Sequence, residues 1–141
     1  MSKTLLETIN LKKTYKHIDG DITLFNNLNL KVKYGDLIAL VGPSGSGKSS
    51  LLHLFALLDE PSKGKILLNN KETKNLTDNQ KDEVRRKNIS IIFQDNNLLT
   101  DFTAIENVMM PLLIKGENEK NILEKANKIL KDVKIIDRSN H

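Results

Sequence analysis

The residues with the clearest chemistry lie in one short loop, GPSGSGKS, at positions 42–49. Gly42, Gly47, Lys48 and Ser49 have the spacing G-x-x-x-x-G-K-[ST], which is the pattern of a phosphate-binding loop. Glycines let successive main-chain amides turn inward around an anion, and a following helix adds the positive end of its dipole. A lysine at this place reaches the β and γ phosphates of a nucleotide, and the serine hydroxyl coordinates Mg²⁺. The pattern therefore predicts binding of a nucleoside triphosphate.

The sequence on either side of the loop predicts the elements that hold it. Before the loop, LIALV (37–41) is a run of five apolar residues, which is typical of a strand buried on both faces in a parallel sheet. After it, KSSLLHLFALL (48–58) predicts a helix that DEPSKG ends. We expect the ligand to contact the loop and the residue after it, namely Gly42, Pro43, Ser44, Gly45, Ser46, Gly47, Lys48, Ser49 and Ser50.

Two further kinds of strand are predicted around this centre. Residues 8–15 and 28–36 alternate apolar and polar side chains, and the turn residues HIDGD lie between them, so they predict an antiparallel pair. KILLN (65–69) predicts another strand, followed by the turn NNKE. ISIIF (89–93) predicts a second buried strand, after a short polar helix over 77–87 that Thr77 or Asp78 caps.

The C-terminal third predicts two helices. Thr103 and Glu106 have the spacing of a capping box at the start of DFTAIENVMMPLL, and Pro111 should end or kink that helix. The stretch 117–134 predicts an amphipathic helix with one apolar stripe, formed by Ile122, Leu123, Ala126, Ile129, Leu130 and Val133.

Composition narrows the class of protein. The 141 residues carry a formal net charge of +4, contain no cysteine, and include no apolar run long enough to cross a bilayer, so we expect one soluble, cytoplasmic α/β domain without thiolate chemistry. The charge is compatible with a polyanionic ligand. We interpret the basic cluster Arg85, Arg86 and Lys87 as a solvated helix face, and we expect no nucleic-acid partner.

Three stretches together resemble a known family: GPSGSGKSSLLH, GKILL and IIFQDNNLLTDFTAIENVMMPLL. They are similar to the ATP-binding subunits of ABC transporters, and within these to the lipoprotein-releasing type, with macrolide-exporter and cell-division types as the nearest alternatives. The resemblance implies an α/β P-loop NTPase fold with an N-terminal antiparallel β subdomain and the start of a helical subdomain, incomplete at the C-terminus. The parts of this single domain would be an antiparallel β part (1–36), a P-loop core part (37–94), and the start of the helical subdomain (95–141).

The resemblance also assigns roles to single residues. Tyr15 would stack on the adenine of ATP, and Gln94 would contact Mg²⁺ together with Ser49 and serve, with Lys48, in catalysis. The segment Asn96 to Asn107 would dock on the integral membrane subunits of a transporter at the inner membrane, and a second ATP-binding subunit would complete a homodimer. More ordinary roles stay open: an aromatic strand residue for Tyr15, a polar end of a strand for Gln94, and a surface loop for the docking segment.

The sequence lacks the hydrolytic machinery that the resemblance implies. A signature of the LSGGQ type, an acidic strand ending in Asp-Glu and a switch histidine do not occur in it. We therefore expect Mg-ATP binding with little or no turnover, and interpret the chain as an engineered truncation, a natural short reading frame or one piece of a longer protein. An inert nucleotide-binding or docking module is an alternative. A GTPase or small kinase is a weaker one, because NKET has Thr73 where a guanine motif needs aspartate.

Overall fold

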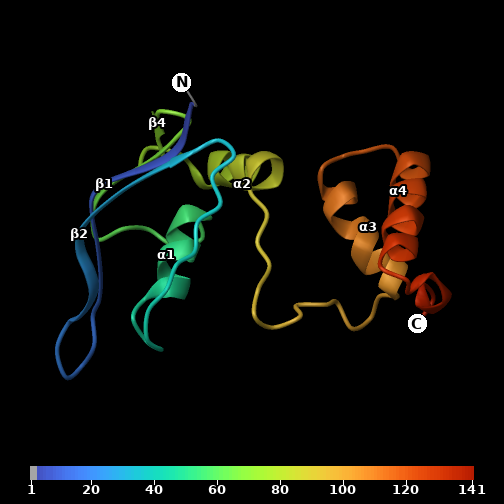
Figure 1. Cartoon of the computed structure of the whole chain (residues 1–141), viewed down its shortest axis with the longest axis horizontal. Helices are drawn as coiled ribbons and strands as arrows, with labels where there is room; N and C mark the ends of the chain where they lie inside the picture. Colours follow the sequence, from blue (N-terminus) through green and yellow to red (C-terminus); the bar gives the residue numbers. More distant parts are fainter. Residues whose placement is uncertain (1–2) are drawn as a thin grey trace. The chain divides into compact units, whose positions relative to one another are not determined.

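The computed structural model describes residues 3–141, which form two units, one up to Arg85 and one from Arg86 to His141. Figure 1 shows a sheet with α1 in the first unit and a pair of helices in the second. No helix within the described residues has the length and apolar character needed to span a membrane.

The first unit contains a four-stranded antiparallel sheet with the strand order β2-β1-β3-β4. Its strands are β1 (Thr4–Tyr15), β2 (Ile22–Lys33), β3 (Lys63–Leu68) and β4 (Lys71–Glu72). The predicted antiparallel pair is therefore confirmed, and both strands begin earlier than the sequence pattern indicated. The turn HIDGD closes with a hydrogen bond from the Gly20 amide to the His17 carbonyl.

Helix α1 (Lys48–Phe55) packs on one face of this sheet. The core consists of Leu51 and Leu54 from the helix together with Leu11 and Ile66 from β1 and β3. The helix ends before the predicted residue 58, because Leu57 adopts a left-handed backbone with φ of 57°. The core thus fixes the helix whose first residue, Lys48, belongs to the glycine-rich loop.

Helix α2 (Asp78–Asn88) follows the sheet. Its cap is Thr77: the Thr77 amide donates to Gln80 Oε1 at 2.9 Å, and the Gln80 amide donates to the Thr77 hydroxyl at 3.4 Å. Arg85 then donates to the carbonyl of Leu57 at 2.6 Å, which links α2 to the end of α1.

The predicted strands 37–41 and 89–93 are wrong for this structure, because neither segment is assigned to a strand or helix. Leu37 and Ile92 are each 100% exposed. A run of this kind becomes a strand only with neighbouring strands beside it and helices over its faces. The described residues supply this environment for neither run.

In the second unit, α3 (Ala104–Ile114) packs against α4 (Glu119–Asp132), and the short helix η1 (Ile136–Arg138) follows. Thr103 and Glu106 form the predicted capping box. Pro111 does not end α3, which continues to Ile114 while the Lys115 amide donates to the Pro111 carbonyl. Half of the predicted stripe of α4 is buried (Ile122, Ala126 and Leu130), whereas Leu123, Ile129 and Val133 stay exposed.

Candidate nucleotide-binding site

The glycine-rich loop adopts a conformation that requires glycine at two positions. Gly45 and Gly47 have φ of 78° and 87°, in the left-handed region that other residues rarely enter. A Cβ on Gly47 would also lie 3.0 Å from Cβ of Leu24 on β2. Gly47 is the N-cap of α1 and no side chain caps the helix. The main-chain amides at the start of α1 therefore have no capping side chain within the described part of the chain.

Most of these amides have no protein acceptor. The Ser46 amide donates to the Pro43 carbonyl at 3.3 Å, and the Leu51 amide donates to the Gly47 carbonyl at 2.9 Å. Within residues 3–141, the main-chain amides of Lys48, Ser49 and Ser50 have no such partner. Free amides at the N-terminus of a helix, together with its dipole, favour a bound anion such as phosphate.

Lys48 places a positive charge on the same loop. Its ammonium group donates to the carbonyl oxygens of Gly42, at 2.8 Å, and Pro43, at 2.6 Å. The side chain thus folds back over the loop that a phosphate would occupy. An anion would compete with these two carbonyls for the ammonium protons, and hydrogen bonds between charged partners are the stronger kind.

Tyr15 is the last residue of β1 and is 41% exposed. Its hydroxyl donates to Asp59 Oδ2 at 2.9 Å, and the Lys13 ammonium lies 4.6 Å from the centre of its ring. The same ammonium donates to Asp59 Oδ1 at 2.7 Å and to the carbonyl of Glu60 at 2.8 Å. Tyr15 is therefore an exposed aromatic ring whose polar end and one face are both occupied by protein groups.

The charge of Asp59 is stabilised in this arrangement. Partial burial raises the pKa of a carboxyl, but here the hydrogen bonds from Lys13, from the Glu60 amide and from Tyr15 outweigh it. The pKa of Asp59 is consequently below its ordinary value. An ionised Asp59 can accept from Lys13 and Tyr15 at the same time.

The remaining predicted site residues belong to the second unit. Gln94 is exposed, in a segment without helix or strand. Downstream, the Asn107 side chain fastens the start of α3: its amide nitrogen donates to the carbonyls of Leu99, Phe102 and Thr103, and its oxygen accepts from the Leu99 amide. The structure thus brings the glycine-rich loop and Tyr15 into one unit and leaves Gln94 in the other.

Sequence reasoning missed Lys13 and Asp59. It also missed the clasp, which is the set of hydrogen bonds by which the Asn107 side chain holds the start of α3. Lys13 and Asp59 are separated by 46 positions, so only the pairing of β1 with the chain after α1 brings them together. No short motif marks such a contact. The clasp was detectable in principle, because Asn107 follows the capping residue Thr103 by one helical turn and could bond back to its carbonyl.

Several curated proteins are similar to the chain. It is 43% identical to the lipoprotein-releasing system ATP-binding protein LolD of Rickettsia bellii (strain RML369-C), over 92% of this chain and 57% of the relative. It is 42% identical to LolD of Wigglesworthia glossinidia brevipalpis, over 97% of this chain and 60% of the relative. The chain therefore spans less than two thirds of the length of these relatives.

Solved structures agree with this similarity. A post-hydrolysis state of the ATP-binding cassette MJ0796, dimeric and bound to ADP and Pi, matches with a TM-score of 0.89 and 34% identity, over 97% of this chain and 61% of that one. The structure of cbiO1 from Clostridium perfringens, part of the transporter complex cbiONQ, matches with a TM-score of 0.76 and 26% identity, over 98% and 53% of the two chains. The pattern of the ABC transporter family matches residues 25–141. On this match the chain belongs to the ABC transporter family, and it has the α/β fold of the family's ATP-binding cassettes.

Proposed function

We propose that the chain binds Mg-ATP at the glycine-rich loop and at Tyr15, and that it acts as the ATP-binding subunit of a transporter that releases lipoproteins from the inner membrane. The observation that carries the proposal is the set of free amides at Lys48, Ser49 and Ser50, next to the Lys48 ammonium. In this arrangement the γ and β phosphates accept from the loop amides and from Lys48, and the adenine stacks on Tyr15.

Ser49 fits the role of a Mg²⁺ ligand. Its side chain is exposed at the first turn of α1, and within the described residues its hydroxyl has no hydrogen-bond partner. Mg²⁺ keeps several waters and is bound through few protein groups plus substrate phosphates, so one hydroxyl can suffice on this side. Bound there, the cation would neutralise phosphate charge. Gln94 would be a second ligand.

The proposal extends to partners. The docking segment Asn96 to Asn107 exposes apolar side chains at Leu98, Leu99 and Phe102. Such side chains suit a protein partner, here the cytoplasmic part of an integral membrane subunit. A second ATP-binding subunit would complete the assembly, as in the dimeric cassette to which the chain is similar. The protein would then be peripheral, on the cytoplasmic side of the inner membrane.

A direct test is titration of the 141-residue chain with a fluorescent ATP analogue in Mg²⁺. We expect saturable binding that Lys48→Ala weakens strongly, because a charge-assisted hydrogen bond contributes roughly 1.5–3 kcal/mol. Lys33→Ala, a change at the exposed end of β2, is a control that should bind as the unaltered chain does. Equal binding by the Lys48→Ala variant would contradict the proposed site.

An alternative function, for the 141 residues taken alone, is a nucleotide-responsive docking module without turnover, since a signature and an acidic strand do not occur among them. In the hydrolytic site that the resemblance implies, the glutamate at the end of the acidic strand would act as a general base. A general base typically contributes about 10²–10⁴-fold to the rate. A phosphate-release assay separates the two: we expect turnover near the background rate. The alternatives to a lipoprotein-releasing transporter are a transporter of the macrolide-exporter type and one of the cell-division type.

A further inference from the structure

The chain after α1 is fastened to the end of β1, directly beside Tyr15. The Ser62 amide donates to the Lys12 carbonyl at 2.8 Å. Ser62 and Thr14 also exchange hydrogen bonds, because the Thr14 amide donates to the Ser62 hydroxyl at 3.0 Å and this hydroxyl donates to the Thr14 carbonyl at 3.1 Å. The main chain that carries Tyr15 is therefore held by the segment that also carries Asp59.

Building on the proposed role of Tyr15, we propose that Asp59 and Lys13 are positioning residues for the nucleobase. Asp59 anchors the hydroxyl of Tyr15, and Lys13 covers one face of the ring. Together they leave the opposite face for the adenine of ATP. Neither residue contacts the phosphates in this arrangement; both act through the ring.

The physical basis is preorganisation. An exposed tyrosine ring turns about two side-chain torsions, and ordering it on binding lowers the affinity. The bond from its hydroxyl to Asp59, at 2.9 Å, fixes the far end of the ring before the ligand arrives. The ammonium of Lys13 is held by Asp59 at 2.7 Å and by the Glu60 carbonyl at 2.8 Å, so it stays over the ring. A cation over an aromatic face is itself attractive.

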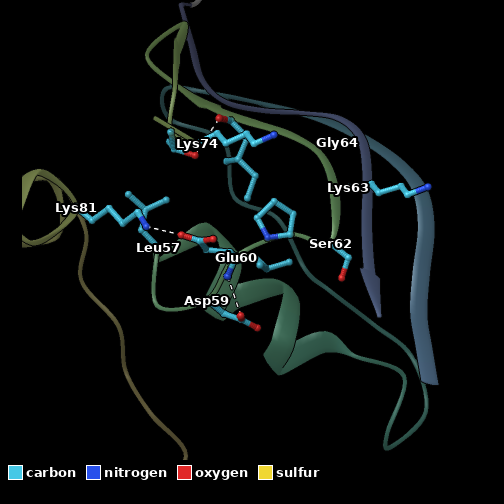
Figure 2. A pocket seen from close by; sticks show the side chains of 12 residues that line it. Leu57, Asp59, Glu60, Ser62, Lys63, Gly64, Lys74 and Lys81 are labelled. Carbon is cyan, nitrogen blue, oxygen red and sulfur yellow. Dashed lines mark hydrogen bonds and ion pairs between the residues drawn. The ribbon is translucent and has the colours of Figure 1, made fainter. Parts of the chain in front are cut away.

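The same segment has a second attachment that does not involve Tyr15. Glu60 pairs with Lys81 of α2 at 2.5 Å, and Figure 2 shows this pair together with Asp59 among the residues that line one pocket. The pocket has a volume of about 350 Å³, and its lining mixes apolar residues such as Leu57 and Ile66 with polar ones such as Ser62 and Thr73. Glu60→Gln therefore loosens the segment on its α2 side while leaving the bond between Tyr15 and Asp59 intact. It is a matched control for Asp59→Ala.

The experiment compares two ligands by calorimetric titration of the 141-residue chain in Mg²⁺: ATP, and inorganic tripolyphosphate, which has the phosphates but no base. We expect Asp59→Ala to weaken ATP binding about fivefold or more, the lower end of what a base–aromatic stack contributes. Binding of tripolyphosphate should change by less than about twofold. Tyr15→Phe keeps the ring and the ion pair between Lys13 and Asp59, and it should also weaken ATP binding. If Asp59→Ala does not fold, the proposal is tested with Tyr15→Phe.

Because both substitutions break the same hydrogen bond, the double variant should bind ATP no more weakly than the weaker single variant. Glu60→Gln should bind both ligands as the unaltered chain does. Unchanged ATP binding in Asp59→Ala and Tyr15→Phe would overturn the proposal, and so would an equal loss for both ligands, which indicates a merely structural role. If the unaltered chain binds neither ligand, the proposed function itself is wrong and this proposal falls with it.

Discussion

Replacement of Leu54 by alanine should destabilise the first unit and thereby the start of α1. Leu54 is 0% exposed and packs with Leu11, Leu51 and Ile66. The substitution removes three carbon atoms, worth about 2.4 kcal/mol at roughly 0.8 kcal/mol per buried CH₂. The cavity left behind adds to this, and buried Leu→Ala changes cost about 2–5 kcal/mol. We therefore expect a loss of about 2.5–5 kcal/mol in the free energy of unfolding.

The two tyrosines, Tyr15 and Tyr34, both lie in the first unit, and the chain has no tryptophan. Tyrosine emission during urea unfolding therefore reports on this unit, and the midpoint with its slope gives the free energy. Leu52→Ala is the matched control: Leu52 is on the same helix but 53% exposed, so its replacement should cost within about 0.5 kcal/mol. A similar loss for both variants, or a loss below about 1 kcal/mol for Leu54→Ala, would refute the assigned core.

Three further outcomes follow from single contacts. Thr103→Ala removes the cap of α3 and should reduce helix stability by about 0.5–2 kcal/mol in thermal unfolding followed by circular dichroism; no change would contradict the capping box. The pKa of Asp59 is lower in the folded chain than in the unfolded chain. The ionised carboxylate therefore contributes to folding stability above the unfolded-state pKa, and this contribution is lost as the pH falls through the folded-state pKa. Asp59→Asn should therefore flatten the fall in stability below about pH 4, and an unaltered acid limb would speak against this. Gly64→Ala should destabilise more than Gly116→Ala in urea, because a Cβ on Gly64 would lie 2.3 Å from the Asn10 carbonyl oxygen, whereas one on Gly116 meets nothing within 4 Å; the reverse order would contradict the close approach of β3 to β1.

The sequence predicted the features that depend on near neighbours. The capping box of Thr103 and Glu106, the turn HIDGD and the start of α1 at the glycine-rich loop are local, because each needs only a few adjacent residues. The position of Lys48 and the glycines that surround it was fixed in the same way. The family resemblance is confirmed by the match over residues 25–141.

Prediction from the sequence failed for features that depend on the tertiary environment. The runs 37–41 and 89–93 are apolar enough for buried strands, yet Leu37 and Ile92 are exposed, because strand formation needs partners that a local pattern cannot guarantee. The outer half of the stripe on α4 is exposed for a related reason: only the face toward α3 is covered. The cluster of Lys13, Tyr15 and Asp59 depends on tertiary pairing and had no local signal.

Under the proposed function, one short segment would serve both ends of a nucleotide. Helix α1 begins at Lys48, in the loop proposed for the phosphates, and the chain just past its end carries Asp59, which holds the ring proposed for the base. The core residues Leu51 and Leu54 lie between these two points. Stability of α1 and nucleotide affinity should therefore change together in core variants such as Leu54→Ala.

The central claim is that main-chain amides at the start of α1 hold the phosphates of a nucleotide. Amide chemical shifts of the ¹⁵N-labelled chain, followed during titration with Mg-ATP, test it most directly. We predict the largest shifts at the amides from Gly45 to Ser50, whose protons have few protein acceptors, and their loss in Lys48→Ala. Saturable binding of Mg-ATP that leaves these amides unshifted, with the shifts instead elsewhere in the chain, would contradict the account.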